Sequence, residues 1–334
     1  MAIHDVAARF YREQVSDSWV PGYLAGRGIG AHAQRRWLTG YAPAESDVLV
    51  RHLRAAGYPD TLIQAAGLAR RSRRGFLTDT FRDRAVLPIR SPRGTIVAFI
   101  GRAAEHAGQD VPKYLNSPGT CLYDKGRALF GLWQARDALA AGAIPVITEG
   151  PLDAIAIAIA ADLAGSVSYA PVALCGSAIT ARQVESLAEA CDLRHTGVLV
   201  ALDNDTAGQH ATVRAYRLLS RLASRIEAVD LAPASDPAQV LRDHGPAELG
   251  AALACRRYPL ADLVIDASIE PWSRWLGFAE GQIGALRAAA GVVASMPPPD
   301  VGRQVARIAA RLDLSYAIVT TAVTDALTQR LGRG

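Results

Sequence analysis

Residues 143–153, AIPVITEGPLD, and residues 197–208, GVLVALDNDTAG, decide the fold of this chain. In each, a short apolar run ends at acidic residues, and a glycine and a helix-like segment follow. Short apolar runs bounded by turn residues are typical of buried strands. Two further runs of this kind, APVALCG at 170–176 and IEAVDLA at 226–232, complete a series of four predicted strands.

Helix-like segments lie between these strands, at 152–164, 181–191 and 207–224. Alternation of strand and helix predicts a parallel sheet covered by helices. The second helix carries a start signal, because Thr180 is followed three residues later by Gln183, as in a capping box. We therefore expect an α/β unit over residues 139–245.

The flanking regions differ from this unit and from each other. Residues 1–138 predict an α+β unit that is helical to about residue 80, with Ser46 as the N-cap of one helix. The runs AVLPIR at 85–90 and TIVAFIGR at 95–102, separated by the turn sequence SPRG, predict a hairpin. Residues 246–334 are rich in alanine and leucine and predict a helical bundle, with MPPPD at 296–300 as a break between helices.

Acidic residues follow three of the four predicted strands. Glu149 follows the first strand, Asp203 and Asp205 the third, and Asp236 the fourth. The carboxyl ends of parallel strands meet at one rim, where ligands of open α/β sheets bind. Carboxylates crowded together repel one another unless cations compensate, and ligand sets made only of oxygen select Mg²⁺ or Mn²⁺ over zinc.

Each acidic residue also has an ordinary structural explanation. Asp203 or Asp205 could cap the helix that begins near Ala207, and Asp153 could be a first-turn residue favoured by the helix dipole. Glu-Gly after one strand combined with Asp-x-Asp-x-x-Gly after another is a much narrower pattern than any single cap. It favours a metal site.

Basic residues are concentrated in the first third of the chain, although the formal net charge is only +4. Such a concentration suits a phosphate-binding surface, and a solvated arginine face explains it equally well. Only two of the 36 basic residues are lysines, Lys113 and Lys125, and both lie in PKYLNSPGTCLYDKG at 112–126. In a chain so rich in arginine, these two lysines suggest a site that needs the compact charge of an ammonium group and not a planar guanidinium. Two residues do not exclude chance. The clustered arginines are Arg70, Arg71, Arg73, Arg74, Arg82, Arg84, Arg90, Arg93 and Arg102.

Composition argues against several other classes of protein. The four cysteines lie far apart and without histidine partners at metal-binding spacing, so we expect neither a zinc site nor a disulfide framework. The longest apolar run, near 154–161, falls short of the roughly 20 residues of a membrane span. The N-terminus lacks the apolar region of a secretory signal, so a cytoplasmic location is expected.

Two acidic motifs of this chain, EGPLDAIAI at 149–157 and LDNDTAGQHA at 202–211, resemble those of the Toprim domain, a Rossmann-like domain. That domain is shared by bacterial DnaG-type primases, topoisomerases and some nucleases. The segment 101–135, with PKYLNSP at its centre, is similar to the segment that precedes Toprim in DnaG-type primases. Other segments match in the same order: YLAGRGI at 23–29, SDPAQVLRDHG at 235–245, and the helical stretches at 258–271 and 286–315.

The resemblance covers nearly the whole chain and implies template-directed primer synthesis by nucleotidyl transfer. It implies Glu149, Asp203 and Asp205 as catalytic metal-binding residues, with Asp236 as a further metal ligand. It also implies that a surface holding template or nucleotide is formed by Arg102, Lys113, Tyr114, Asn116 and Lys125. The expected partners are single-stranded DNA template and nucleoside triphosphates, with a helicase or a separate zinc-binding initiation module in trans and no membrane.

This chain departs from the family pattern in three respects. It shows neither the cysteines nor the length for the family's zinc-binding domain, and no sequence after residue 330 for its helicase-interaction domain. The family's Asp-Pro-Asp reads Asp236-Pro237-Ala238 here, which removes one carboxylate. The resemblance thus predicts a polymerase core alone, from a mobile element or from a split system. A Toprim-type nuclease, or a catalytically weak nucleic-acid-binding accessory protein of a mobile element, is the alternative.

Overall fold

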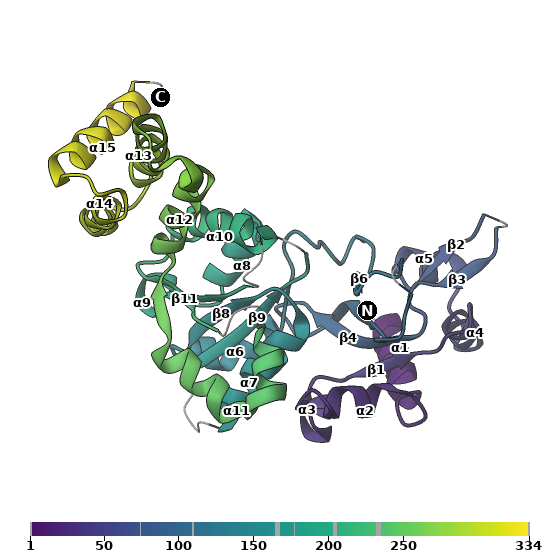
Figure 1. The fold of residues 1–334 in the computed structure, drawn as a ribbon. Coiled ribbons are helices and arrows are strands. Elements are labelled where there is room, and N and C mark those ends of the chain that lie inside the picture. Colours follow the sequence, from purple (N-terminus) through teal and green to yellow (C-terminus); the bar gives the residue numbers. More distant parts are fainter. Residues whose placement is uncertain are drawn as a thin grey trace.

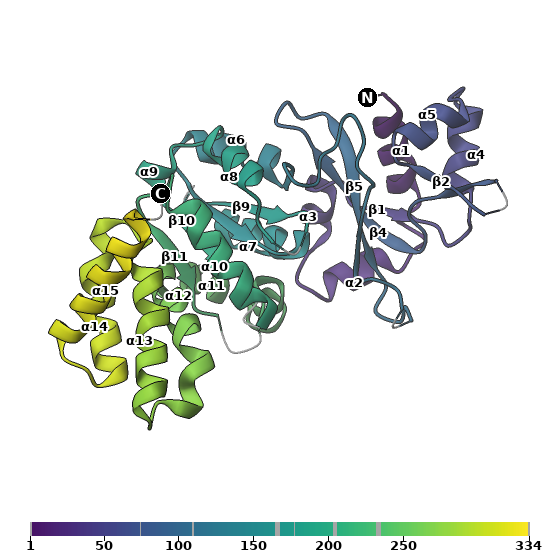
Figure 2. The same cartoon turned by 90° about the horizontal axis from the view of Figure 1, so that it is seen from above.

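The computed structural model describes residues 2–73, 75–108, 110–163, 168–176, 178–202, 206–231 and 235–332, with the backbone alone for 206–211. Three units follow one another along the molecule, from the N-terminal unit through a central α/β unit to a helical C-terminal unit (Figure 1). The view from above shows the same order, with the C-terminal helices packed beside the central unit (Figure 2).

The N-terminal unit is built on a four-stranded antiparallel sheet in the order β1-β4-β5-β6. As predicted, the runs near residues 85 and 95 form a hairpin, in which Leu87 of β4 lies opposite Ile100 of β5. A separate hairpin is formed by β2 and β3. The elements of this unit are α1 (Ala2–Glu13), α2 (Val20–Ala25), α3 (Ala31–Arg36), β1 (Gly40–Ala42), α4 (Val48–Ala55), α5 (Asp60–Ala65), β2 (Ala69–Arg71), β3 (Leu77–Asp79), β4 (Arg84–Arg90), β5 (Ile96–Ala103) and β6 (Tyr114–Asn116).

The start of α4 differs from the sequence prediction. Asp47, and not Ser46, is the N-cap residue, and its side chain makes no cap hydrogen bond. The carboxylate of Asp79, some thirty residues later at the end of β3, instead accepts the backbone N–H groups of Leu49 and Val50 at 2.8 and 3.0 Å. The prediction was wrong because a distant buried carboxylate can satisfy helix N–H groups that local sequence rules assign to the neighbouring side chain.

The central unit contains a six-stranded sheet in the order β12-β11-β10-β8-β9-β7. The four strands predicted from sequence, β8, β9, β10 and β11, are mutually parallel. Both edge strands, β7 and β12, are antiparallel and were not predicted. The strands are β7 (Leu129–Phe130), β8 (Ile144–Thr148), β9 (Tyr169–Leu174), β10 (Val198–Ala201), β11 (Ile226–Val229) and β12 (Arg257–Pro259).

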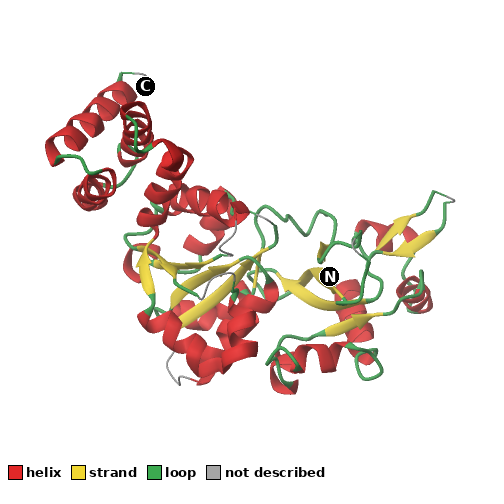
Figure 3. Ribbon diagram, in the orientation of Figure 1, coloured by secondary structure: helices red, strands yellow, loops and turns green. Residues whose placement is uncertain are grey.

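Helices cover both faces of this sheet, as Figure 3 shows. One core joins the sheet to α7 and α11, and it continues into the N-terminal unit through Trp37 and Ile100. The other core joins the sheet to α6, α8, α9 and α10 and continues into the C-terminal helices. The helices are α6 (Leu132–Ala140), α7 (Pro151–Leu163), α8 (Ala181–Ala188), α9 (Leu193–Thr196), α10 (Thr206–Leu219) and α11 (Pro237–Cys255).

One local sequence signal of the central unit is confirmed. Thr180 and Gln183 form the predicted capping box at the start of α8. The alternating AIAIAIA segment of α7 is almost wholly buried, because this helix lies between the sheet and α11. Such burial explains why α7 is apolar on all sides.

The C-terminal unit is helical, as the sequence predicts. Ion pairs join its first helix, α12, to α14. Asp262 and Asp266 of α12 form ion pairs with Arg303 and Arg307 of α14, and the shortest of these is 2.6 Å. The MPPPD segment separates α13 from α14, as expected. The elements are α12 (Leu260–Ile269), the 3-10 helix η1 (Glu270–Trp275), α13 (Ala279–Val293), α14 (Pro298–Leu312) and α15 (Tyr316–Leu331).

Unit boundaries in the structure follow strand pairing. β7 pairs with β9, so residues from Leu129 onward contribute to the central sheet. Further along the chain, Gly245 interrupts α11 with a positive φ of 81°. None of the described helices is long and apolar enough to cross a membrane.

Candidate functional site

A cavity of about 410 Å³ lies where the N-terminal unit meets the carboxyl ends of β8 and β9. Every described residue of the predicted site lines it. These residues are Arg102, Lys113, Tyr114, Asn116, Lys125, Glu149 and Asp236. Asp203 and Asp205, the two remaining predicted ligands, lie outside the described residues.

One side of the cavity, the acidic wall, consists of Glu149, Asp153 and Asp236. Glu149 comes directly after β8 and is partly exposed. Asp153 lies in the first turn of α7 and is 8% exposed. Its carboxylate accepts the N–H of Gly150 at 3.1 Å and the N–H of Ala238 at 3.2 Å, so it joins the loop after β8 to the start of α11.

Asp236 is a helix cap that also lines the cavity. It is the N-cap of α11, and its Oδ1 accepts the Gln239 N–H at 2.6 Å. It also lines the cavity together with Glu149. Capping fixes the orientation of this carboxylate at the rim, so the structural role and a ligand role are compatible.

Ala238, where the family pattern has an aspartate, lies at the same rim. Its side chain is 3% exposed and packs in the core beneath the cavity. Its backbone N–H is the group that Asp153 accepts. The substitution therefore leaves the backbone connection in place and changes only the charge at the rim.

The same cavity is lined by a second group of residues, the basic wall, which consists of Arg102, Lys113, Tyr114 and Lys125. Arg102 lies on β5 directly opposite Tyr114 of β6. Its guanidinium is 5.3 Å from the Tyr114 ring centre, and its Nε donates to the Tyr23 hydroxyl at 3.1 Å. These contacts hold the arginine over the cavity by cation–π and hydrogen-bond interactions.

Tyr114 and Cys175 remain neutral at physiological pH. Burial, together with the nearby Asp153 carboxylate, raises the pKa of the Tyr114 hydroxyl well above its ordinary value. Burial likewise raises the pKa of the Cys175 thiol to about 11. Both side chains are thus poor candidates for an ionised nucleophile.

The structure adds Arg27 to the site, which the sequence analysis missed. Arg27 lines the cavity, donates to Glu105 at 2.6 Å and lies over the Tyr23 ring at 4.9 Å. Its Nε is buried and has no hydrogen-bond partner among the described residues. The only sequence signal was its position in YLAGRGI, a segment that matched the family without a role being assigned to it.

Arg84 does not belong to an exposed basic surface. It is 4% exposed, and its Nη1 donates to the carbonyls of Gly101 and Pro112 at 3.1 and 2.9 Å. Burial lowers its pKa. Sequence alone could not separate it from exposed neighbours such as Arg82, because the antiparallel pairing of β4 with β5 decides which arginines point inward.

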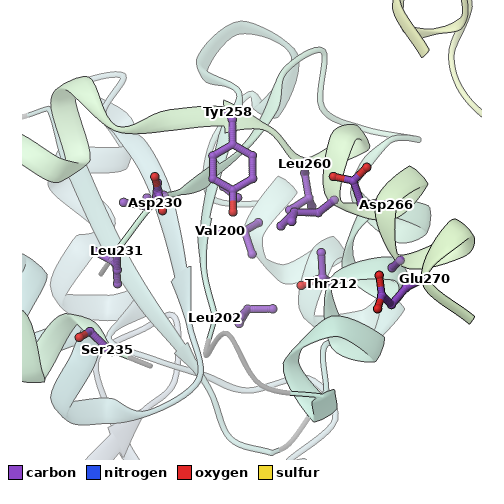
Figure 4. Close-up of a pocket in the computed structure, with 14 residues that line it drawn as sticks. Val200, Leu202, Thr212, Asp230, Leu231, Ser235, Tyr258, Leu260, Asp266 and Glu270 are labelled. Carbon is purple, nitrogen blue, oxygen red and sulfur yellow. The ribbon is translucent and has the colours of Figure 1, made fainter. Parts of the chain in front are cut away.

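A second, smaller hollow of about 150 Å³ lies between β10, β11 and α12. Figure 4 shows Val200, Leu202 and Leu260 around its apolar centre, with Thr212 and Glu270 nearby. It has no basic side chain in its lining and shares no residue with the cavity between the acidic and basic walls. The predicted site residues that the structure describes line the larger cavity.

Two family models match this chain. The family model of the DNA primase catalytic core, N-terminal domain, matches residues 10–136, and a Toprim-like model matches residues 146–241. A DNA primase of Mycobacterium tuberculosis is 32% identical over 313 residues, which cover 92% of this chain and 47% of that protein. The chain therefore spans about half the length of the primase that it matches.

Solved structures match over nearly their full length. The crystal structure of the RNA polymerase domain of Mycobacterium tuberculosis primase DnaG superposes with a TM-score of 0.76 at 30% identity, covering 92% of this chain and 97% of that one. The same domain in complex with a double-stranded DNA oligomer with a 6-nucleotide overhang gives a TM-score of 0.74 at 30% identity, covering 94% and 97%.

Proposed function

We propose that this chain, which belongs to the family of DnaG-type DNA primases, is a polymerase core that synthesises short primers on a nucleic-acid template. The observation that carries the proposal is that carboxylates of the central unit and the side chains of the basic wall line the same cavity. Phosphoryl transfer needs this combination, because its catalysis rests on positioning and on stabilising charge around the transferred group.

The acidic wall offers oxygen donors for a divalent cation, although the residues that the structure describes do not by themselves form a group of three metal ligands. Glu149 and Asp236 offer carboxylate oxygens to the same cavity, and oxygen donors suit Mg²⁺ or Mn²⁺. We propose that these two residues, with Asp203 and Asp205, hold the metal. A divalent cation bound there would offset the negative charge of the triphosphate and favour ionisation of the attacking hydroxyl.

The basic wall would bind the phosphates. Lys113 and Lys125 are exposed and supply mobile ammonium groups, whereas Arg102 is held between aromatic rings. Arginine can bind a phosphate through two parallel N–H groups, and lysine acts as a point charge. Arg27, whose buried Nε has no hydrogen-bond partner in the part of the chain that the structure describes, adds a fourth cation at the same cavity.

The proposed reaction is attack of a primer 3′-hydroxyl on the α-phosphate of an incoming nucleoside triphosphate, with pyrophosphate leaving. Template pairing would select the base. The overhang-DNA complex of the related Mycobacterium tuberculosis domain supports DNA as the template. Family membership adds a helicase and a zinc-binding initiation module as proposed partners.

A priming assay on random single-stranded DNA, with all four ribonucleotides and either Mg²⁺ or Mn²⁺, tests the proposal. The expected result is metal-dependent formation of short products that need a template. Cleavage of labelled DNA without nucleotides would instead support the nuclease alternative. DNA binding without metal binding in a direct titration would support the accessory-protein alternative.

A further inference from the structure

A further cavity, of about 490 Å³, lies at the amino end of β9. It is bordered by α6, by the last turns of α7, by the end of α3 and by the first residues of β9. The predicted site lies at the other end of this strand, roughly 17 Å away from Tyr169 by the rise of the strand to Leu174. The two cavities share none of the residues that the structure describes.

This cavity belongs to both units of the protein. Arg36 and Trp37, at the end of α3, come from the N-terminal unit, and the other described lining residues come from the central unit. Arg36 forms an ion pair with Asp162 of α7 across the boundary, and Trp37 stacks on Phe130 with 5.2 Å between the ring centres. Ligand cavities are common where two units meet, and a ligand bound here would contact both.

The surface of the cavity is mainly apolar and is made of small side chains. The aromatic residues Trp37 and Tyr169 also contribute to it. Flat apolar molecules pack well against aromatic rings and short side chains, so the body of a suitable ligand is a flat ring. The small apolar lining residues are Ala135, Ala138, Ala141, Ala158, Ala161, Ala170 and Pro171.

One polar atom of the lining calls for a hydrogen-bond donor. The Tyr169 hydroxyl already donates to the Leu253 carbonyl at 3.1 Å and accepts from Nη2 of Arg257 at 2.7 Å. Oε1 of Gln134, in contrast, is buried and has no hydrogen-bond partner among the residues that the structure describes. A buried acceptor without a partner is unfavourable, so a ligand with an N–H group would relieve that cost.

The charge of the lining favours a cation. Its described residues include two carboxylates, Asp137 and Asp162, against one guanidinium, Arg36, which gives a formal charge of −2 + 1 = −1. Asp137 lies 3.2 Å from Nη2 of Arg136, but its side chain is 82% exposed, so this pair is weak and its carboxylate can take another partner. The phosphates of a nucleotide would be repelled here, in contrast to the predicted site.

We propose that this cavity binds a flat aromatic cation with N–H donors, of the amidine or protonated amino-heterocycle class, and that the bound ligand links the N-terminal and central units. The N–H group would donate to Gln134, and the ring would cover the alanine surface. Such a ligand would bind together with metal and nucleotide and not in competition with them. The inference does not depend on the proposed function, because binding is measured without primer synthesis.

Calorimetry on the whole chain tests the chemistry of the site with three probes that share one ring. Benzamidine is a cation with N–H donors, benzamide is neutral with N–H donors, and benzoate is an anion without donors. We expect a Kd on the order of 0.1–1 mM for benzamidine, several-fold weaker binding of benzamide, and benzoate at least about tenfold weaker than benzamidine. The affinity for benzamidine should be the same with and without Mn²⁺ and ATP.

Two variants test the location. Gln134→Leu should weaken benzamidine binding about 5- to 10-fold without lowering the melting temperature, because a leucine replaces an unpaired acceptor. Ala138→Phe should abolish binding by filling the cavity. Ala140→Phe is the matched control, since Ala140 is exposed on the same helix and is not among the described lining residues. Its affinity should remain that of the wild type.

Four results would overturn the inference. They are absence of benzamidine binding by the folded wild type, equal affinities for benzamidine and benzoate, wild-type affinity in both Gln134→Leu and Ala138→Phe, and loss of benzamidine binding when Mn²⁺ and ATP are present. The last result would place benzamidine in the predicted site. Absence of primer synthesis would contradict the proposed function and leave this inference standing.

Discussion

The acidic wall and the basic wall face one cavity but are held in place by different forces. The acidic wall is fixed by backbone hydrogen bonds, since Asp153 accepts two N–H groups and Asp236 caps α11. The basic wall is fixed by side-chain contacts, in which Arg102 lies between the rings of Tyr23 and Tyr114. Removing Asp153 or Asp236 therefore risks the loops themselves, whereas removing a residue of the basic wall chiefly alters binding.

The largest expected effect is the loss of primer synthesis in Glu149→Gln, which we contrast with Asp153→Asn below. Glu149→Gln should reduce primer synthesis by about 10³-fold or more, because it removes a charge that we assign to the metal, with the melting temperature nearly unchanged. Asp203→Asn and Asp205→Asn should abolish synthesis in the same way. Primer yield and thermal unfolding check these variants, and normal yield in all three would refute the metal assignment.

Asp153→Asn is the matched contrast to Glu149→Gln. An amide at position 153 cannot accept both the Gly150 and the Ala238 N–H groups, so the join between the loop after β8 and α11 is weakened. The expected cost is about 1–3 kcal/mol of unfolding free energy, with a parallel loss of activity. Denaturant unfolding measures this loss of stability. An unchanged midpoint would show that the hydrogen bonds of Asp153 do not hold the loop after β8 against α11.

The next effect contrasts two arginines on paired strands. Arg84→Met should lower the unfolding free energy by about 2–3 kcal/mol, because the Gly101 and Pro112 carbonyls lose a charged donor. Arg102→Met should cost less than about 1 kcal/mol but weaken template or nucleotide binding. Denaturant unfolding and binding titrations on both variants measure the two effects. A larger loss of stability in Arg102→Met, or a larger loss of binding in Arg84→Met, would contradict these assignments.

A smaller effect is expected for Lys113→Ala. Lys113 is exposed, so its loss should leave the melting temperature within about 1 °C and weaken nucleotide or template binding roughly tenfold. The salt dependence of DNA or nucleotide binding should also become shallower, because one phosphate contact is lost. A large fall in melting temperature with normal binding would show that Lys113 is structural.

The smallest effect concerns Ala238. Losing one carboxylate should leave the wild type slow in Mg²⁺ and faster in Mn²⁺, since Mn²⁺ binds the same ligands more tightly. Ala238→Asp should narrow that difference by a few-fold. Because Ala238 is buried and adjoins Asp153, we also expect a small loss of stability, about 1 kcal/mol, from repulsion between the two carboxylates. Titrations of primer synthesis with Mg²⁺ and with Mn²⁺, on the wild type and on Ala238→Asp, measure the metal preference. An equal preference in the two proteins would show that position 238 does not affect the metal site.

The sequence by itself determined the parallel strands and the rim on which their acidic residues lie. Strand periodicity and turn residues are local properties, and parallel strands necessarily bring their carboxyl ends together. The capping box at Thr180 is local in the same sense. For this reason Glu149 and Asp236 could be expected at one site before the structure was known.

Features that depend on contacts between residues far apart in the sequence were decided only by the tertiary structure. The cap of α4 comes from Asp79, the inward direction of Arg84 from strand pairing, and the membership of Arg27 in the site from packing between units. The antiparallel edges β7 and β12 are two and three residues long, too short to show a period. The amide of Asn116 donates to the carbonyl of Cys175, 59 residues away, and no local pattern specifies such a contact.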